Sequence, residues 1–177
     1  LVDKAPEHWD DLWRPEYKNS IMLIDGAREV MGLGLNSLGY GLNDKNADHL
    51  QEAVDKLYKL TPNIKAIVAD EMKGYMIQNN AAIGVTFSGE ARQMLEKNED
   101  LRYVVPSEAS NLWFDNIVIP KTVKNKKAAY QPKEVQDDEA FYPTAETMKH
   151  LEVYKQIGPK WLGIYNDLYL QVKMYRK

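Results

Sequence analysis

Two carboxylates follow a buried-strand pattern at a position where ligands often bind. Asp25 ends the strand pattern of residues 20–25, and Glu29 lies four residues further on, in the first turn of a predicted helix. Ligands of open α/β sheets bind outside the carboxyl ends of the strands, so both charges are predicted to face a ligand. A structural role suits them too, because Asp is a favoured N-cap and an acid in a first turn complements the helix dipole.

Aromatic side chains accompany a further acid. Phe87 closes the predicted strand 81–87, and Trp113 and Asp115 lie at the start of the one predicted for 112–119. Because side chains alternate along a strand, Trp113 and Asp115 are predicted to share a face. A ring beside a carboxylate suits a cation with an apolar body, since the ring takes methylenes or charge and the carboxylate takes an ammonium. The structural alternative is a half-exposed Asp bonded to backbone N–H groups.

Other chemical motifs are weak. The three histidines, His8, His49 and His150, share no metal-ligand spacing. The glycines at 32 and 34 lack the third glycine of a dinucleotide loop. Ser88 lies at a strand-to-helix turn without the flanking glycines of a hydrolase nucleophile, so it is predicted to cap a helix. We therefore expect no metal and no cofactor.

Composition excludes several classes of protein. The 177 residues carry 23 basic and 26 acidic side chains, a formal charge of −3, with 44% hydrophobic residues and no cysteine. This is the composition of a globular domain, and it disfavours nucleic-acid binding through phosphate contacts. A disulfide scaffold and a cysteine metal site are excluded. The apolar runs are shorter than the roughly 20 residues that a membrane span needs.

The elements that must position these residues alternate along the chain. Such alternation indicates a mainly parallel sheet with helices on both faces. The stretch 121–138 is polar and is predicted to be a surface connection. Strands are predicted at 20–25, 64–69, 81–87, 101–105 and 112–119, and helices at 27–38, 44–60, 70–79, 88–97, 143–157 and 161–175.

Four stretches carry a resemblance to a known family. They are Trp-Asp-Asp-Leu-Trp-Arg-Pro-Glu-Tyr-Lys at 9–18, Asp-Gly-Ala-Arg-Glu-Val at 25–30, Asn-Leu-Trp-Phe-Asp-Asn-Ile-Val-Ile-Pro at 111–120, and Phe-Tyr-Pro with Glu-Thr within 141–147. With these motifs the sequence resembles the bacterial spermidine/putrescine-binding proteins, the substrate-binding components of polyamine ABC importers. The resemblance covers nearly the whole chain in the same residue order.

The resemblance implies an architecture. Proteins of this family have two α/β lobes with the polyamine in the cleft between them, a type II periplasmic-binding-protein fold. This chain looks like the second lobe alone, residues 1–177. Segments 1–130 and 132–177 would flank a missing crossover to the other lobe, with the junction near Gln131. We expect a central, mostly parallel five-stranded sheet with at least one antiparallel strand.

The resemblance also implies a binding site. Glu29 matches an amine-binding carboxylate, and Asp25 can substitute for an acid that the family can place at Gly26. Phe87 stands where relatives have a Trp, and Tyr154 stands where a relative has a polar amide. The predicted ligand-binding set is Asp25, Glu29, Phe87, Trp113, Asp115 and Tyr154.

The implied function is capture of spermidine or putrescine for a membrane permease, with no bond broken and no cofactor. The implied partners are the first lobe and the permease, the protein would be a monomer, and its place would be outside the cytoplasm, either periplasmic or lipid-anchored. Two alternatives stay open. One is a lobe for another solute, although an anion would favour Arg and Lys in the cleft. The other is an enzyme with Asp25 and Glu29, or Glu29 and Asp115, as an acid/base pair, for which no nucleophile or oxyanion site is apparent.

Overall fold

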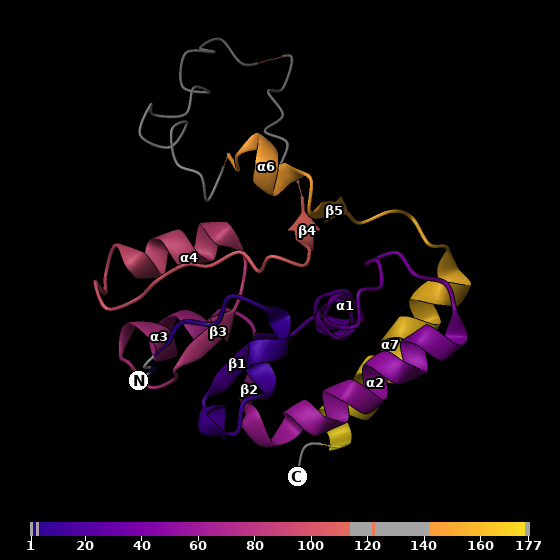
Figure 1. Ribbon diagram of the computed structural model, residues 1–177, viewed down its shortest axis with the longest axis horizontal. Helices are drawn as coiled ribbons and strands as arrows, with labels where there is room; N and C mark the ends of the chain where they lie inside the picture. Colours follow the sequence, from indigo (N-terminus) through magenta and orange to yellow (C-terminus); the bar gives the residue numbers. More distant parts are fainter. Residues whose placement is uncertain (1, 3, 114–121, 123–141, 176–177) are drawn as a thin grey trace.

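The computed structural model describes residues 2, 4–113, 122 and 142–175. Helices and strands alternate along the first half of the chain, and the longest helix comes last (Figure 1). The strands are β1 (Ile21–Ile24), β2 (Ile64–Val68), β3 (Ile83–Val85), β4 (Ser110–Leu112) and β5 (Leu151–Val153). The helices are α1 (Ala27–Ser37), α2 (Ala47–Leu60), α3 (Glu71–Ile77), α4 (Ser88–Leu95), α6 (Ala145–Met148) and α7 (Pro159–Tyr175), with short 3-10 turns at Trp9–Trp13, Pro15–Tyr17 and Thr61–Asn63.

The central sheet has three parallel strands in the order β2-β1-β3. Leu23 of β1 is paired with Ile67 on one side and with Val85 on the other. Parallel strands need helical crossovers, which α1, α2 and α3 provide along the chain. The carboxyl ends of β1 and β3 therefore lie side by side at one edge of the sheet.

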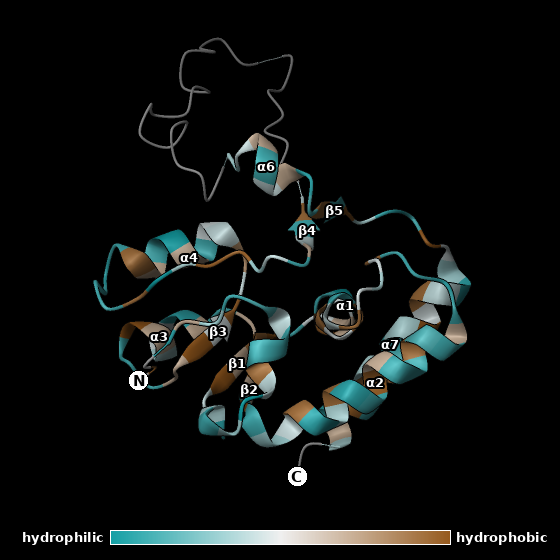
Figure 2. Cartoon of the chain, in the orientation of Figure 1, coloured by the Kyte–Doolittle hydropathy of each residue, from teal (hydrophilic) through white to brown (hydrophobic). Residues whose placement is uncertain are grey.

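Both faces of this sheet are covered. Ile21 and Leu23 point into a core shared with α1, α2 and α7, whereas Met22 points to the opposite side and packs with residues of α3 and α4. The alternation follows from the period of two along a strand. Figure 2 shows the apolar strands between helices whose outward surfaces are hydrophilic. The predicted α/β fold with helices on both faces is confirmed.

Helix α2 shows how the sequence determines where a helix begins and which of its faces is buried. Asn46 caps its first turn by accepting a hydrogen bond from the Asp48 backbone N–H at 2.9 Å. Leu50, Val54 and Leu57 are fully buried at helical spacing, so one stripe of α2 faces the core.

The predicted helix at 143–157 is wrong over most of its length. Only α6 forms there, and it is capped by Thr144, whose side chain accepts from the Thr147 backbone N–H. The following residues form β5 instead, which pairs in parallel with β4 through Ser110–Leu151 and Leu112–Val153. Pairing with a strand distant in the sequence overrides local helix propensity here.

The predicted five-stranded sheet is not confirmed. The described residues form one three-stranded and one two-stranded sheet. Every strand pairing in these two sheets is parallel, so the expected antiparallel strand is not found among the described residues. Residues 101–105, predicted as a strand, have no strand pairing in the described part of the chain. Strand β4 begins before the predicted strand 112–119, most of which lies outside the described residues, as does the junction near Gln131.

Candidate functional site

The carboxyl edge of the sheet brings two predicted site residues to neighbouring positions. Leu23 and Val85 are partners in register, and Asp25 and Phe87 each lie two residues beyond them. Helix α1 starts directly after Asp25, so Glu29 lies in its first turn at the same edge. The topology therefore places these three residues together, where parallel sheets bind ligands.

Two predicted rings are in contact. Phe87 and Trp113 meet edge to face, with ring centroids 5.2 Å apart and planes inclined by 61°. Phe87 precedes α4, and Trp113 follows β4. Trp113 stays 45% exposed, so the pair presents aromatic surface to the outside. Such a surface can hold the methylenes of a ligand or a positive charge.

Glu29 is folded back over the start of its own helix. A Cβ added at Gly26 would lie 2.9 Å from Glu29 Cδ and would overlap its Oε2 atom. The carboxylate therefore occupies space that only a glycine leaves free. An acid at position 26, which the resemblance permits, would require Glu29 to move. The position of the Glu29 carboxylate therefore depends on the glycine at position 26.

Asp25 is engaged by the last helix. Lys173 Nζ donates to Asp25 Oδ2 at 2.7 Å, and the Tyr169 hydroxyl donates a short hydrogen bond to Oδ1. These bonds, from Lys173 first and Tyr169 second, hold the pKa of Asp25 below its ordinary value. Burial raises the pKa of Tyr169, and the hydrogen bond to Asp25 raises it further. Asp25 is thus a paired acid that fastens α7 to the sheet.

Tyr154 lies half-buried after β5, beside a cation of the chain itself. The Arg28 guanidinium carbon is 4.5 Å from the centre of the Tyr154 ring. Burial is the main cause that raises the pKa of Tyr154, and the negative charge of Glu29 adds to it. The charge of Glu29 also raises the pKa of Tyr169. Glu29 therefore acts electrostatically on both phenols.

Asp115, the sixth predicted site residue, lies outside the described residues. Sequence reasoning missed Arg28, Tyr169 and Lys173. The signal for the last two was present, because Tyr165, Tyr169 and Lys173 recur every four residues and so share one face of α7.

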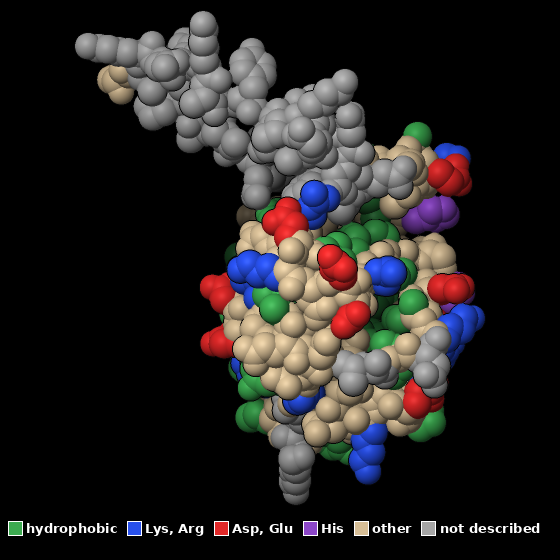
Figure 3. Space-filling view, turned by 90° about the vertical axis from the view of Figure 1, so that its left-hand side faces the viewer, with side chains coloured by type: hydrophobic (Ala, Val, Ile, Leu, Met, Phe, Trp, Pro, Cys, Tyr) green, Lys and Arg blue, Asp and Glu red, His purple; other side chains and the backbone are tan. Residues whose placement is uncertain are grey.

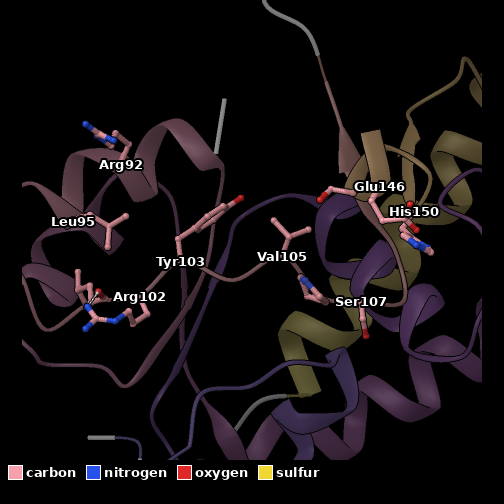
Figure 4. Close-up of a pocket in the computed structure, with 11 residues that line it drawn as sticks. Arg92, Leu95, Arg102, Tyr103, Val105, Ser107, Glu146 and His150 are labelled. Atoms are coloured by element: carbon pink, nitrogen blue, oxygen red, sulfur yellow. Dashed lines mark hydrogen bonds between the residues drawn. The ribbon is translucent and has the colours of Figure 1, made fainter. Parts of the chain in front are cut away.

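An open groove of about 630 Å³ lies apart from these residues. Figure 4 shows Arg92 of α4 and Arg102 on one side, His150 and Glu146 on the other, and Tyr103 between them. None of the five predicted site residues that the structure describes lines this groove. Its two arginines make it a poor place for a polyvalent cation.

The face of the molecule drawn in Figure 3 is mixed in charge. On the face in Figure 3, basic and acidic side chains are interspersed rather than gathered by sign. No group of three or more potential metal ligands occurs among the described residues. Within the same residues, no helix is both long and apolar enough to cross a membrane. What the sheet edge offers is aromatic surface and carboxylates, a combination that favours a cation.

Known proteins resemble this chain over its whole length. It is 66% identical to the spermidine/putrescine ABC transporter substrate-binding protein PotD of Streptococcus pneumoniae, with a TM-score of 0.88 over 100% of this chain and 64% of that one. A putative spermidine/putrescine ABC transporter of Listeria monocytogenes is 50% identical, with a TM-score of 0.86 over 98% of this chain and 63% of its own.

Curated relatives of the chain are also named for polyamine binding. The spermidine/putrescine-binding periplasmic protein of Escherichia coli is 29% identical over 98% of this chain and 58% of its own length. The chain thus spans less than two thirds of the relatives it matches. The sequence profile of the bacterial extracellular solute-binding proteins matches residues 1–132. By this match over most of its length, the chain belongs to the bacterial extracellular solute-binding proteins.

Proposed function

We propose that this chain is one lobe of a polyamine-binding protein and supplies one wall of the cleft that captures spermidine or putrescine for an ABC importer. The observation that carries the proposal is the contact of the Phe87 and Trp113 rings, with Phe87 two residues beyond the end of β3 and Glu29 in the first turn of the helix that follows the neighbouring strand β1. The names of the relatives from Streptococcus pneumoniae and Escherichia coli support the choice of ligand.

In this proposal different residues bind different parts of the polyamine. Glu29 binds one ammonium group, and the exposed rings of Trp113 and Phe87 pack against the methylenes. Asp115, on the sequence pattern, binds a second ammonium. Asp25 contributes less than the sequence suggests, because Lys173 and Tyr169 already occupy its oxygens. Tyr154 lines the site beside Glu29.

The proposal assigns no catalytic step, cofactor or metal to this lobe. Its partners would be the polyamine, a first lobe that closes over the site, and a membrane permease. The protein would act as a monomer. Its place would be outside the cytoplasm, because relatives from Salmonella typhimurium and Escherichia coli are named periplasmic proteins. The junction to the other lobe would lie near Gln131.

Calorimetric titration with spermidine and putrescine tests the proposal. In the two-lobe protein that carries this chain, both amines should bind with micromolar or tighter affinity, because the closed cleft excludes water and strengthens each charge contact. The uncharged analogue 1,4-butanediol is the matched control and should not bind. Binding of the diol as tightly as putrescine, or no binding of either amine, would overturn the proposal.

The 177-residue chain alone should bind spermidine only in the millimolar range. An exposed carboxylate–amine contact contributes about 0–1 kcal/mol, which does not offset the freedom lost on association. Affinity should fall further with added salt. Salt-insensitive micromolar binding by this chain would show that a second lobe is not needed.

A further inference from the structure

Arg28 links three segments of the chain that are distant in sequence. It precedes Glu29 in the first turn of α1, and its Nη2 atom donates to Leu42 O at 2.9 Å and to Asn43 Oδ1 at 3.0 Å. Its guanidinium carbon lies 4.5 Å from the Tyr154 ring centre and 5.1 Å from that of Tyr165. A single cation therefore joins the loop after α1, the segment after β5 and helix α7.

Asn43 binds the backbone on both sides of Tyr154. Its Nδ2 atom donates to Val153 O at 2.9 Å, and its Oδ1 atom accepts from the Lys155 N–H at 2.6 Å. An amide that pairs with the residues before and after Tyr154 fixes the direction in which that side chain leaves the backbone. Arg28 in turn holds the same Asn43 oxygen, so the ring and its backbone are held together.

Glu152 completes this connection. One of its carboxylate oxygens accepts from the Leu42 N–H at 2.6 Å, and the other accepts from Asn43 Nδ2 at 2.6 Å. Charge-assisted bonds of this length are among the stronger ones in proteins. The loop at 41–44 and the segment at 152–155 are thus fastened to each other.

Helix α1 packs against the hydroxyl end of Tyr154. A Cβ added at Gly32 would lie 3.4 Å from the Tyr154 hydroxyl and 2.8 Å from Leu42 Cδ2. The Tyr154 hydroxyl therefore packs against α1 at a position that has no side chain. One ring face is covered by Arg28, and a ligand ammonium cannot share that face because the two positive charges repel.

We infer that Arg28, Asn43 and Glu152 are positioning residues, which hold Tyr154 in one orientation beside Glu29 as a preformed part of the amine site. This rests on the proposed function. Since Arg28 covers one ring face, a polyamine would approach the Tyr154 ring from its other face. Preorganisation of this kind increases affinity because less side-chain freedom is lost on binding.

A double-mutant cycle in the two-lobe protein, titrated with spermidine by calorimetry, tests the inference. Asn43→Ala should weaken binding about five- to tenfold, and Tyr154→Ala should do the same or more. The double variant should bind no more weakly than Tyr154→Ala alone, because Asn43 acts only through Tyr154. Arg28→Lys should retain more affinity than Arg28→Met, since it keeps a cation beside the ring.

Asn46→Ala is the matched control. It removes an amide hydrogen bond three residues away that caps α2, so it should lower the melting temperature without changing affinity. If Asn43→Ala behaves like this control, or if its effect adds fully to that of Tyr154→Ala, the inference is wrong while the proposed function stands. If the unaltered protein binds no spermidine, the proposed function falls, and this inference falls with it.

Discussion

Lys173 Nζ lies 2.7 Å from Asp25 Oδ2, which joins the last helix to the end of the central strand. Tyr169 takes the other oxygen of the same carboxylate. Within the described residues, Glu29, four residues further along, has no such bond to α7, and its charge raises the pKa of Tyr154 and of Tyr169. The two acids at this edge therefore differ: Asp25 is paired with α7 and stabilises the lobe, and Glu29 is the acid that we propose for the ligand contact.

The two acids should respond differently to neutralisation. In the two-lobe protein, Glu29→Gln should weaken spermidine binding by about 2–3 kcal/mol, because a desolvated ammonium loses its charged partner. Asp25→Asn should change the affinity by less than about 1 kcal/mol, because that acid is already paired. Calorimetry on both variants measures the difference. Equal losses would show that Asp25 also binds the ligand.

Asp25→Asn should affect stability in a pH-dependent way. The folded-state pKa of Asp25 is below its ordinary value, so the ionised form stabilises the fold at neutral pH and this contribution is lost as the pH falls through the lowered pKa. Both side chains are about 40% exposed, at 39% and 40%, so the contribution is about 0–1 kcal/mol. Urea unfolding at pH 7 and at about pH 2 should show the variant less stable only at pH 7. A difference that grows on acidification would contradict the pairing.

Gly26→Ala should disturb Glu29 without straining the backbone. The φ and ψ angles of Gly26 are −160° and 130°, which an alanine adopts readily. Its Cβ would displace the Glu29 carboxylate, so spermidine affinity should fall by about 1 kcal/mol or more. In the Glu29→Gln background the same change should have little further effect on affinity, as a titration of all four proteins would show. Full additivity of the two changes would separate Gly26 from Glu29.

The Phe87–Trp113 contact should be measurable by itself. Phe87→Leu keeps apolar bulk but removes the edge-to-face pair, which contributes about 0.5–1.5 kcal/mol beyond burial. Urea unfolding of Phe87→Leu, Trp113→Leu and the double variant gives the coupling between the rings. A coupling energy near zero would mean that the rings touch without stabilising each other.

Local patterns were sufficient to predict most of the sheet and its helices. The apolar runs that became β1, β2 and β3 are short and flanked by turn residues, and the stripe of α2 has clear helical spacing. Local patterns were insufficient at β5, because its pairing with β4 depends on residues about forty positions away, which no local pattern encodes.

The candidate site was predictable to a similar extent. Residue type and strand ends indicated Asp25, Glu29 and Phe87, because the ends of parallel strands meet at one edge. That Asp25 is held by Lys173 could not be read from spacing, since the partner comes from the last helix. The contact of Arg28 with Tyr154 likewise depends on how α1 and the segment after β5 are brought together in three dimensions.

The position of α7 in the core has a consequence for the order of folding. Tyr165, Tyr169 and Val172 are buried among residues of the first two helices, so the core is completed by a helix that lies far from α1 and α2 in the sequence. Until α7 packs against them, part of the apolar surface of α1 and α2 is uncovered, and such surfaces are prone to aggregate. The packing of α7 onto α1 and α2 is therefore a long-range contact, and its formation is expected to be a slow step in the folding of this lobe.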